Sequence, residues 1–336
     1  MHGTLPRILG FLLFPSTLCL VPSFGFLGSR HHYEGSRVSM ACSYAIDAYG
    51  DDAAALHRAV EGALDEVDRI DRLMSHYKPE SPLSRLNRAA SGGPVAVEPE
   101  LFDFIAEALQ YSRDSGGAFD ITVGPLMKAW GFFHGDGRVP AEDELADLRH
   151  RIGFQHVVLN ARDRTITFDR PGIELDLGGI AKGYAVDRAV EVLRRQGVAG
   201  ALVSAGGSTI FGLGAPPGRT AWDVSLQDPI DPRAVALTVQ LKDRALSVSG
   251  SYEKSFESGG VRYSHIMDPR TGRPAQGMLS VAVLTSTGTA GDALDDVFFV
   301  EGVEKSRAHL KRLAATEAFF FVPAPRTRWW MVHVVP

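Results

Sequence analysis

Cysteine and clustered positive charge are both scarce in this sequence. Its 336 residues include only two cysteines, Cys19 and Cys42, and neither lies in a Cys-x-x-Cys pair. This argues against a thiolate zinc site and against a disulfide framework. Lys and Arg number 35 against 40 Asp and Glu, for a formal net charge of −5. Because nucleic-acid binding requires clustered Lys and Arg, we expect no nucleic-acid partner.

The remaining composition is that of a globular protein. Hydrophobic residues make up 45% and charged residues 22% of the chain, which excludes wholesale disorder. A mass of 36.3 kDa is sufficient for a large hydrophobic core. After the N-terminal segment, no hydrophobic run approaches the ~20 residues that a membrane-spanning helix needs.

The N-terminus has the pattern of a secretory signal. Residues 8–29 carry no charge and follow Arg7, which predicts a signal peptide within residues 1–29 and export of the protein. Pro15 and Pro22 interrupt the apolar run and argue against a straight membrane-spanning helix. An uncleaved anchor or a misassigned start codon are the alternatives.

The order of the expected elements favours an α+β fold. Apolar residues at a 4-3-4-3-4 spacing predict a helix over 52–74, and a second helix is expected at 99–115. Several strands follow one another between about 200 and 250, unlike the alternation of a doubly wound sheet. We expect residues 38–336 to form a single domain. Strands are expected at 156–159, 165–168, 202–203, 222–226, 236–241, 280–285, 318–322 and 329–335, with the aromatic runs 319–321 and 329–330 buried.

The first candidate site is the segment Asp176-Leu-Gly-Gly-Ile-Ala-Lys-Gly183, called the glycine turn below. We expect a strand at 172–177 before it and a helix after it. This arrangement presents free backbone N–H groups to a phosphate, and glycine permits close approach of the ligand. Lys182 would neutralise phosphate charge, and Asp176 would accept a hydrogen bond from a ribose or a base. The alternative is a tight corner that binds no ligand.

The second candidate site is His265, which precedes the turn Asp-Pro-Arg-Thr-Gly at 268–272. A histidine titrates near neutral pH, so this position suits a general base. A surface histidine at the end of a strand is the alternative.

The third candidate site is the acidic cluster Asp292, Asp295 and Asp296. These residues lie on one face of an expected helix that continues into the apolar run 297–300. Their carboxylates repel one another unless a cation intervenes, and hard oxygen ligands suit Mg²⁺. The alternative is a helix whose first turn is rich in acidic residues. Together, a phosphate cradle, a divalent cation and a base favour cleavage or transfer at a phosphoric anhydride.

These three sites occur in the order typical of the ApbE-type flavin transferase family (FAD:protein FMN transferase), which the chain resembles from about Met40 to Gly302. The resemblance also includes Met74-Ser-His-Tyr-Lys-Pro-Glu-Ser-Pro-Leu-Ser-Arg-Leu-Asn87 and Gly117-Ala-Phe-Asp-Ile-Thr-Val-Gly-Pro-Leu126, with Trp130-Gly131 after it.

The resemblance implies mixed β-sheets covered by helices, with FAD in a cleft between two lobes. It implies Mg²⁺-dependent transfer of FMN from FAD to a Thr or Ser hydroxyl of a target flavoprotein, with release of AMP. Family members act outside the cytoplasm on subunits of membrane redox complexes, which implies a location in the periplasm or on the outer face of the inner membrane.

The resemblance also assigns roles to individual residues. His265 matches the base that deprotonates the acceptor hydroxyl. The metal would bind the acidic cluster and a backbone carbonyl near Gly179. The implied FAD contacts are Met40, Tyr77, Ala118, Phe119, Asp120, Asp176, Lys182 and Ile266.

Two departures from the family pattern are present. The family usually has threonine where this chain has Asp296, so the metal site would be one charge more negative. The surroundings of Cys19 lack a good lipid-attachment box. Two further functions use the same site residues: an FAD pyrophosphatase, with water as the acceptor, and a non-enzymatic flavin carrier.

Overall fold

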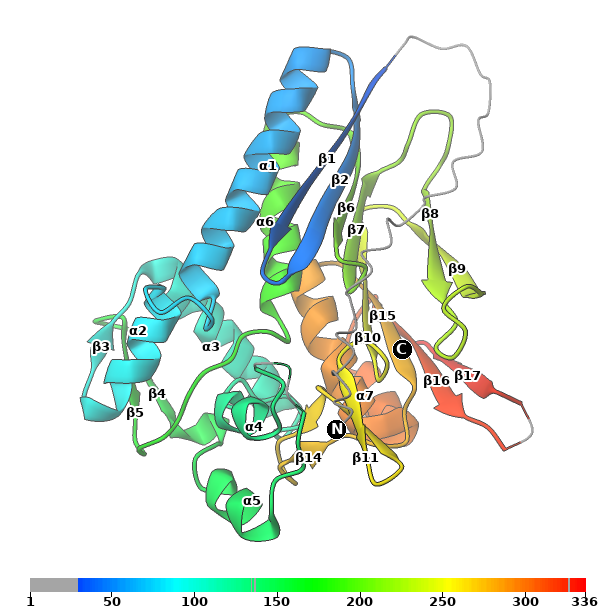
Figure 1. Cartoon of the computed structure of the whole chain (residues 1–336). Helices are drawn as coiled ribbons and strands as arrows, with labels where there is room; N and C mark the ends of the chain where they lie inside the picture. Colours follow the sequence, from blue (N-terminus) through cyan, green and yellow to red (C-terminus); the bar gives the residue numbers. More distant parts are fainter. Residues whose placement is uncertain (1–29, 134, 136, 326) are drawn as a thin grey trace, which may run out of the picture.

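The computed structural model describes residues 30–336 apart from 134, 136 and 326. Its largest element is an eight-stranded sheet, shown in Figure 1. Within the described residues, all neighbouring strands of this sheet pair antiparallel. In spatial order the strands are β1 (His31–Ser39), β2 (Cys42–Gly50), β6 (Gly200–Ala205), β7 (Thr209–Gly214), β10 (Arg244–Gly250), β15 (Ser280–Thr285), β16 (Glu317–Pro323) and β17 (Trp329–Val334).

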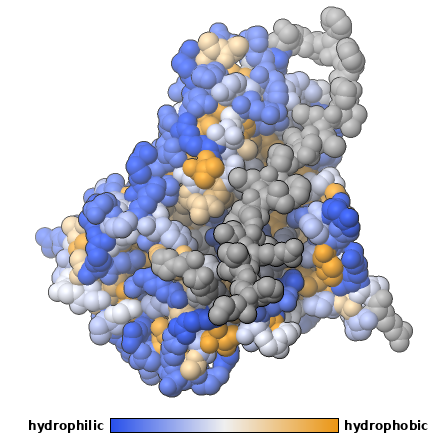
Figure 2. Space-filling model, in the orientation of Figure 1, coloured by the Kyte–Doolittle hydropathy of each residue, from blue (hydrophilic) through white to orange (hydrophobic). Residues whose placement is uncertain are grey.

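Three long helices, α1 (Ala53–Met74), α6 (Ala181–Arg195) and α7 (Gly288–Leu310), lie along one face of the sheet (Figure 1). The predicted helix over 52–74 is confirmed by α1. Its N-terminus is capped by Asp52, whose carboxylate accepts a 2.7 Å hydrogen bond from the Ala55 N–H. The apolar stripe of α1 is buried in the main core, while Figure 2 shows mainly hydrophilic side chains on its outward side.

The opposite face of the sheet packs against the hairpin formed by β8 (Trp222–Gln227) and β9 (Val235–Leu241). Trp222, Leu241 and Phe321 are buried there in a second hydrophobic cluster. The large sheet is therefore covered on both faces.

A second group of elements lies beyond the C-terminal end of α1 (Figure 1). It contains a three-stranded sheet in the order β3-β5-β4 and four helices. Its members are α2 (Pro82–Ala89), β3 (Val95–Ala96), α3 (Pro99–Asp114), α4 (Gly124–Ala129), α5 (Glu142–Arg149), β4 (Val157–Asn160) and β5 (Thr165–Phe168). Two short hairpins complete the chain: β11 (Ser255–Ser258) with β12 (Val261–Ser264), and β13 (Met267–Asp268) with β14 (Arg273–Pro274).

The structure confirms the predicted α+β class, and α3 confirms the second predicted helix. The predicted strand at 172–177 is wrong: only Glu174 forms an isolated bridge, with Val123. Trp330 was predicted to be buried but is 57% exposed, because β17 is an edge strand of the sheet. The strands β1 and β2 were not predicted, and the predicted signal peptide lies outside the described residues.

Within the described part of the chain, no helix combines the length and the apolar character that crossing a membrane would require.

Candidate active site

One pocket brings together all the residues predicted for the site. The predicted residues among its lining are Met40, Tyr77, Ala118, Phe119, Asp120, Asp176, Gly179, Lys182, His265, Ile266, Asp292, Asp295 and Asp296. Segments that are distant in the sequence therefore meet in one cleft.

The tight turn between β1 and β2 brings Met40 to the pocket. Met40 and Ala41 form the whole connection and have φ angles of 50° and 58°. A two-residue hairpin loop with both central φ values positive normally contains Asn or Gly, so the turn is strained here. The Tyr44 hydroxyl donates a 3.2 Å hydrogen bond to the Met40 sulfur and so helps to fix this side chain.

The glycine turn is organised around Asp176. Its Oδ1 accepts a 2.8 Å hydrogen bond from the Gly178 N–H and lies 3.1 Å from Nδ1 of His76. Burial opposes ionisation of Asp176, but the His76 contact and the Gly178 N–H outweigh it and lower the pKa of the carboxyl. Asp176 thus holds both the turn and the imidazole of His76 in place at the pocket wall.

Helix α6 begins at Ala181, within the glycine turn, and its first turn meets the start of α7. The Gly183 N–H donates a 2.9 Å hydrogen bond to Oδ2 of Asp292, and the Thr209 hydroxyl donates to Oδ1 at 3.1 Å. A Cβ on Gly183 would lie 2.1 Å from the Gly288 carbonyl oxygen, so only glycine permits this approach. Asp187 of α6 accepts hydrogen bonds from the backbone N–H groups of Gly288 and Thr289, the first residues of α7.

The other two members of the acidic cluster share one donor. The Ser249 hydroxyl lies 3.1 Å from an oxygen of Asp295 and 2.7 Å from one of Asp296. Burial, with the charges of the neighbouring aspartates, raises the pKa of Asp295 well above its usual value. Burial and the charge of Asp292 raise the pKa of Asp296 to about 7, although the Ser249 hydrogen bond lowers it.

Asp295, Asp296 and the backbone of the glycine turn would offer oxygen ligands to a divalent cation. A Cβ at Gly179 would lie 2.6 Å from Oδ2 of Asp296, so the absence of a side chain leaves the carboxylate beside the turn backbone. Carboxylate and carbonyl oxygens are the donors that Mg²⁺ prefers. Asp292 faces Gly183 and Thr209 instead, so it also joins the two helices.

Lys182 is a cation of the pocket itself. Burial alone would lower the pKa of its ammonium group, but Asp292, Glu253 and Asp295 outweigh burial and raise that pKa. Lys182 therefore stays charged and partly offsets the repulsion within the acidic cluster.

His265 lies between β12 and the turn at 268–272, and its ring is in edge contact with Phe132. Its backbone N–H donates a 2.9 Å hydrogen bond to the Lys254 carbonyl oxygen. Burial, and then the charges of Lys182 and Lys254, lower the pKa of the imidazole to about 4. Nδ1 is buried and has no hydrogen-bond partner among the described residues. The ring is therefore neutral at pH 7 and has a free nitrogen.

Two of the predicted flavin contacts, Tyr77 and Asp120, differ in what they contact within the protein. Tyr77 is 47% exposed and stacks on Phe133, with ring centroids 4.6 Å apart. Asp120 accepts hydrogen bonds from Thr122 and from the Phe154 N–H. Burial raises the pKa of the Asp120 carboxyl. Tyr77 offers an aromatic surface to a ligand, whereas Asp120 mainly fixes the loop around it.

Several further pocket residues were not predicted as site residues: His76, Phe132, Ser249, Glu253 and Lys254. His76 lies within a motif segment, but no feature of the sequence distinguishes it. The others lie on a strand or in connections without a motif, so only the tertiary structure reveals them.

The chain resembles known proteins over most of its length. The model of the ApbE family matches residues 40–320. The FAD:protein FMN transferase of Treponema pallidum is 34% identical over 327 residues, covering 93% of this chain and 90% of that protein. The Vibrio cholerae protein of the same name is 36% identical over 262 residues, covering 76% of each.

Solved structures show the same similarity. The ApbE protein of Thermotoga maritima superposes with a TM-score of 0.82 at 28% identity, covering 90% of this chain and 97% of that one. The flavin transferase ApbE of Vibrio cholerae gives a TM-score of 0.80 at 30% identity, covering 91% and 98%. From the family match and these relatives, we conclude that the chain belongs to the ApbE family.

Proposed function

We propose that this protein transfers the FMN moiety of FAD, with Mg²⁺, to a Thr or Ser hydroxyl of a target flavoprotein and releases AMP. The family relationship supports a transferase that takes FMN from FAD and gives it to a protein acceptor. The observation that carries the finer proposal is that His265, the glycine turn and the acidic cluster line a single pocket.

The proposed step is a displacement at the FMN phosphorus. A bond forms between the acceptor hydroxyl oxygen and this phosphorus, and the bond from phosphorus to the anhydride oxygen breaks. AMP leaves with that oxygen, and the hydroxyl proton passes to the neutral imidazole of His265. Neither oxidation nor reduction is involved, and the atoms balance without a further reactant.

The chain's own charges suit an anionic substrate. Lys182 and Lys254 lie in the pocket with His265, and both lower its pKa. Gly178 and Gly179 of the glycine turn line the same pocket as the acidic cluster. Asp295, Asp296 and the Gly179 carbonyl would hold the cation, with Asp292 beside them. When bound, Mg²⁺ would offset the negative charge of the pyrophosphate.

We further propose that the protein acts outside the cytoplasm, in the periplasm or on the outer face of the inner membrane, on a membrane redox-complex subunit. The uncharged segment 8–29 after Arg7 supports this proposal. Fractionation of cells that express the full chain, with N-terminal sequencing of the mature protein, tests the location.

The decisive experiment for activity is incubation with FAD, Mg²⁺ and candidate flavoproteins, followed by mass spectrometry. We expect an FMN adduct on Thr or Ser and one AMP per adduct, both abolished by EDTA. Release of free FMN at a rate that no acceptor changes would instead establish a pyrophosphatase. FAD binding with neither product would establish a carrier.

A further inference from the structure

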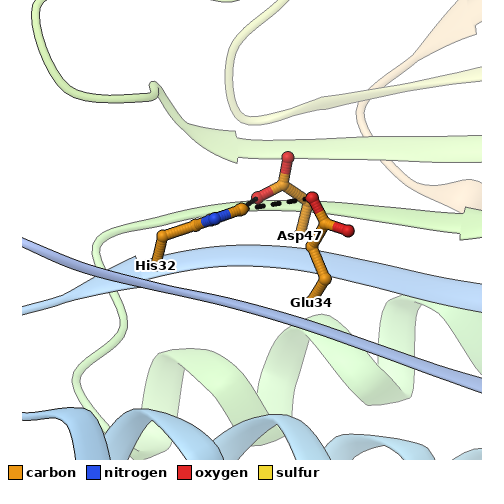
Figure 3. Close-up of side chains that lie close together, drawn as sticks. All are labelled: His32, Glu34 and Asp47. Atoms are coloured by element: carbon orange, nitrogen blue, oxygen red, sulfur yellow. Dashed lines mark hydrogen bonds and ion pairs between the residues drawn. The ribbon is translucent and has the colours of Figure 1, made fainter. Parts of the chain in front are cut away.

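Three potential metal ligands lie together on the hairpin of β1 and β2, and none of them lines the active-site pocket. His32 and Glu34 come from β1, and Asp47 comes from β2 (Figure 3). One ligand atom of each residue lies within 4.8 Å of the others. The side chains stand on the face of the hairpin away from α1 and α6 (Figure 3).

The strand register places two negative charges directly opposite each other. Glu34 pairs with Asp47 across the two strands, and His32 pairs with Tyr49. Like charges at directly opposed positions destabilise an antiparallel pair unless something positive lies between them. The His32 Nε2 lies 2.7 Å from Oδ1 of Asp47 and 3.6 Å from Oε1 of Glu34.

Asp47 is incompletely satisfied by this arrangement. Its residue is only 8% exposed, and Oδ2 has no hydrogen-bond partner in the described part of the chain. Burial raises the pKa of its carboxyl, although His32 counteracts this. A buried carboxylate oxygen without a partner costs stability, so this oxygen favours binding of a polar or cationic ligand.

Neighbouring side chains hold His32 in place, whereas Glu34 is free to adjust. The His32 ring stacks on Tyr49, with centroids 4.7 Å apart and planes at 23°, which holds the imidazole towards Asp47. The Glu34 side chain is 63% exposed and can approach without disturbing the core. Tetrahedral zinc requires ligand atoms about 3.3 Å apart, given bonds of about 2.0 Å.

We propose that His32, Glu34 and Asp47 form a zinc site with water at the open position. An imidazole with two carboxylates and no thiolate matches the ligand chemistry of Zn²⁺. The metal would neutralise the opposed carboxylates and occupy the unpartnered Asp47 oxygen. It would thereby stabilise β1, an edge strand of the sheet, and the hairpin whose turn carries Met40 to the pocket.

Titration of the full chain with Co²⁺ in saturating Mg²⁺, followed by addition of Zn²⁺, tests this site. We expect one Co²⁺ per chain, with a visible absorption band that Zn²⁺ removes. His32→Ala and Asp47→Asn should each weaken binding by at least about tenfold, since loss of even an outer-shell partner of a metal ligand costs about 10–100-fold. His31→Ala is the matched control, because the adjacent side chain points to the other face of the strand.

The Asp292→Asn variant separates this site from the active site, since it should retain the Co²⁺ band whatever its transferase activity. A second measurement is thermal unfolding, in which Zn²⁺ should raise Tm for the native chain and for His31→Ala but not for His32→Ala. Absence of the band, or equal binding by native, His32→Ala and Asp47→Asn proteins, would show that the cluster is only an ion-pair network.

Discussion

Gly183 donates its backbone N–H to the carboxylate of Asp292 over 2.9 Å, although the two residues are 109 positions apart. This bond joins the glycine turn to the acidic cluster and sets the start of α6 against the start of α7. His265 lines the same pocket. The contact between α6 and α7 thus holds the glycine turn beside the acidic cluster, while His265 reaches the pocket from the connection after β12.

Replacing Asp292 with Asn should weaken both the contact between α6 and α7 and the binding of Mg²⁺. The Gly183 N–H and the Thr209 hydroxyl each donate to a different oxygen of this carboxylate, and Asn places an NH2 group where one of those oxygens accepts, so one of the two hydrogen bonds is lost or reversed. We expect a loss of about 1–3 kcal/mol in the free energy of unfolding. We also expect the Mg²⁺ concentration needed for half-maximal activity to rise by about tenfold or more. Urea unfolding and Mg²⁺ titration at fixed FAD measure the two effects. Unchanged titration curves would remove Asp292 from the ligand set.

A Gly183→Ala substitution should separate the two helices. Its Cβ would lie 2.1 Å from the Gly288 carbonyl oxygen, which is backbone and cannot rotate away. Overpacking of this kind costs about 1–3 kcal/mol or more. Gly62→Ala in α1 is the matched control, since its Cβ would meet only Val192 at 3.8 Å, and it should stabilise the helix by about 0.5–1 kcal/mol. Equal unfolding curves for both variants would contradict the close contact.

Replacing His265 with Gln should reduce FMN transfer about 10²–10⁴-fold while FAD still binds. The native imidazole has a pKa of about 4 in the free protein, so it is neutral from pH 6 to 8. Phosphates bound near Lys182 and Lys254 should offset their charges and raise this pKa. We therefore expect the acidic limb of kcat at higher pH than that of kcat/KM. Full activity of the Gln variant would exclude His265 as the base.

The stability of the metal-free protein should depend on the ionisation of Asp296. Its pKa is raised to about 7 in the folded state from an ordinary value of 3.8, so the folded protein holds this proton more tightly than the unfolded chain does. This contribution is present at low pH and is lost as the pH rises through 7.

Comparison with Asp296→Asn isolates that contribution. In EDTA, the variant should gain stability relative to the native protein between pH 5 and 8, by more than about 1 kcal/mol, since one pKa unit corresponds to about 1.36 kcal/mol. At pH 8, Mg²⁺ should reduce the difference in unfolding free energy between this variant and the native protein. Parallel curves of unfolding free energy against pH would show that Asp296 is ionised throughout this range.

Local patterns predicted the regular elements well. The apolar spacing of 52–74 and the apolar segment 280–285 correspond to α1 and β15. The strand predicted at 172–177 is wrong because the alternating apolar residues of this segment are buried in the main core without pairing to a strand. The hairpin of β1 and β2 escaped prediction because its turn is Met40-Ala41 rather than a typical turn pair.

The sequence by itself determined the family pattern, the fold class and the residue types of the candidate site, since motif order and helix periodicity are local properties of the chain. Only the tertiary structure decided which residues meet: the pairing of Gly183 with Asp292, of Ser249 with the acidic cluster and of His76 with Asp176. These contacts join segments that are far apart in the chain. The burial that sets the pKa values of His265 and Asp296 also results from the packing of such segments. Distance and dielectric environment depend on packing, which composition and spacing do not specify.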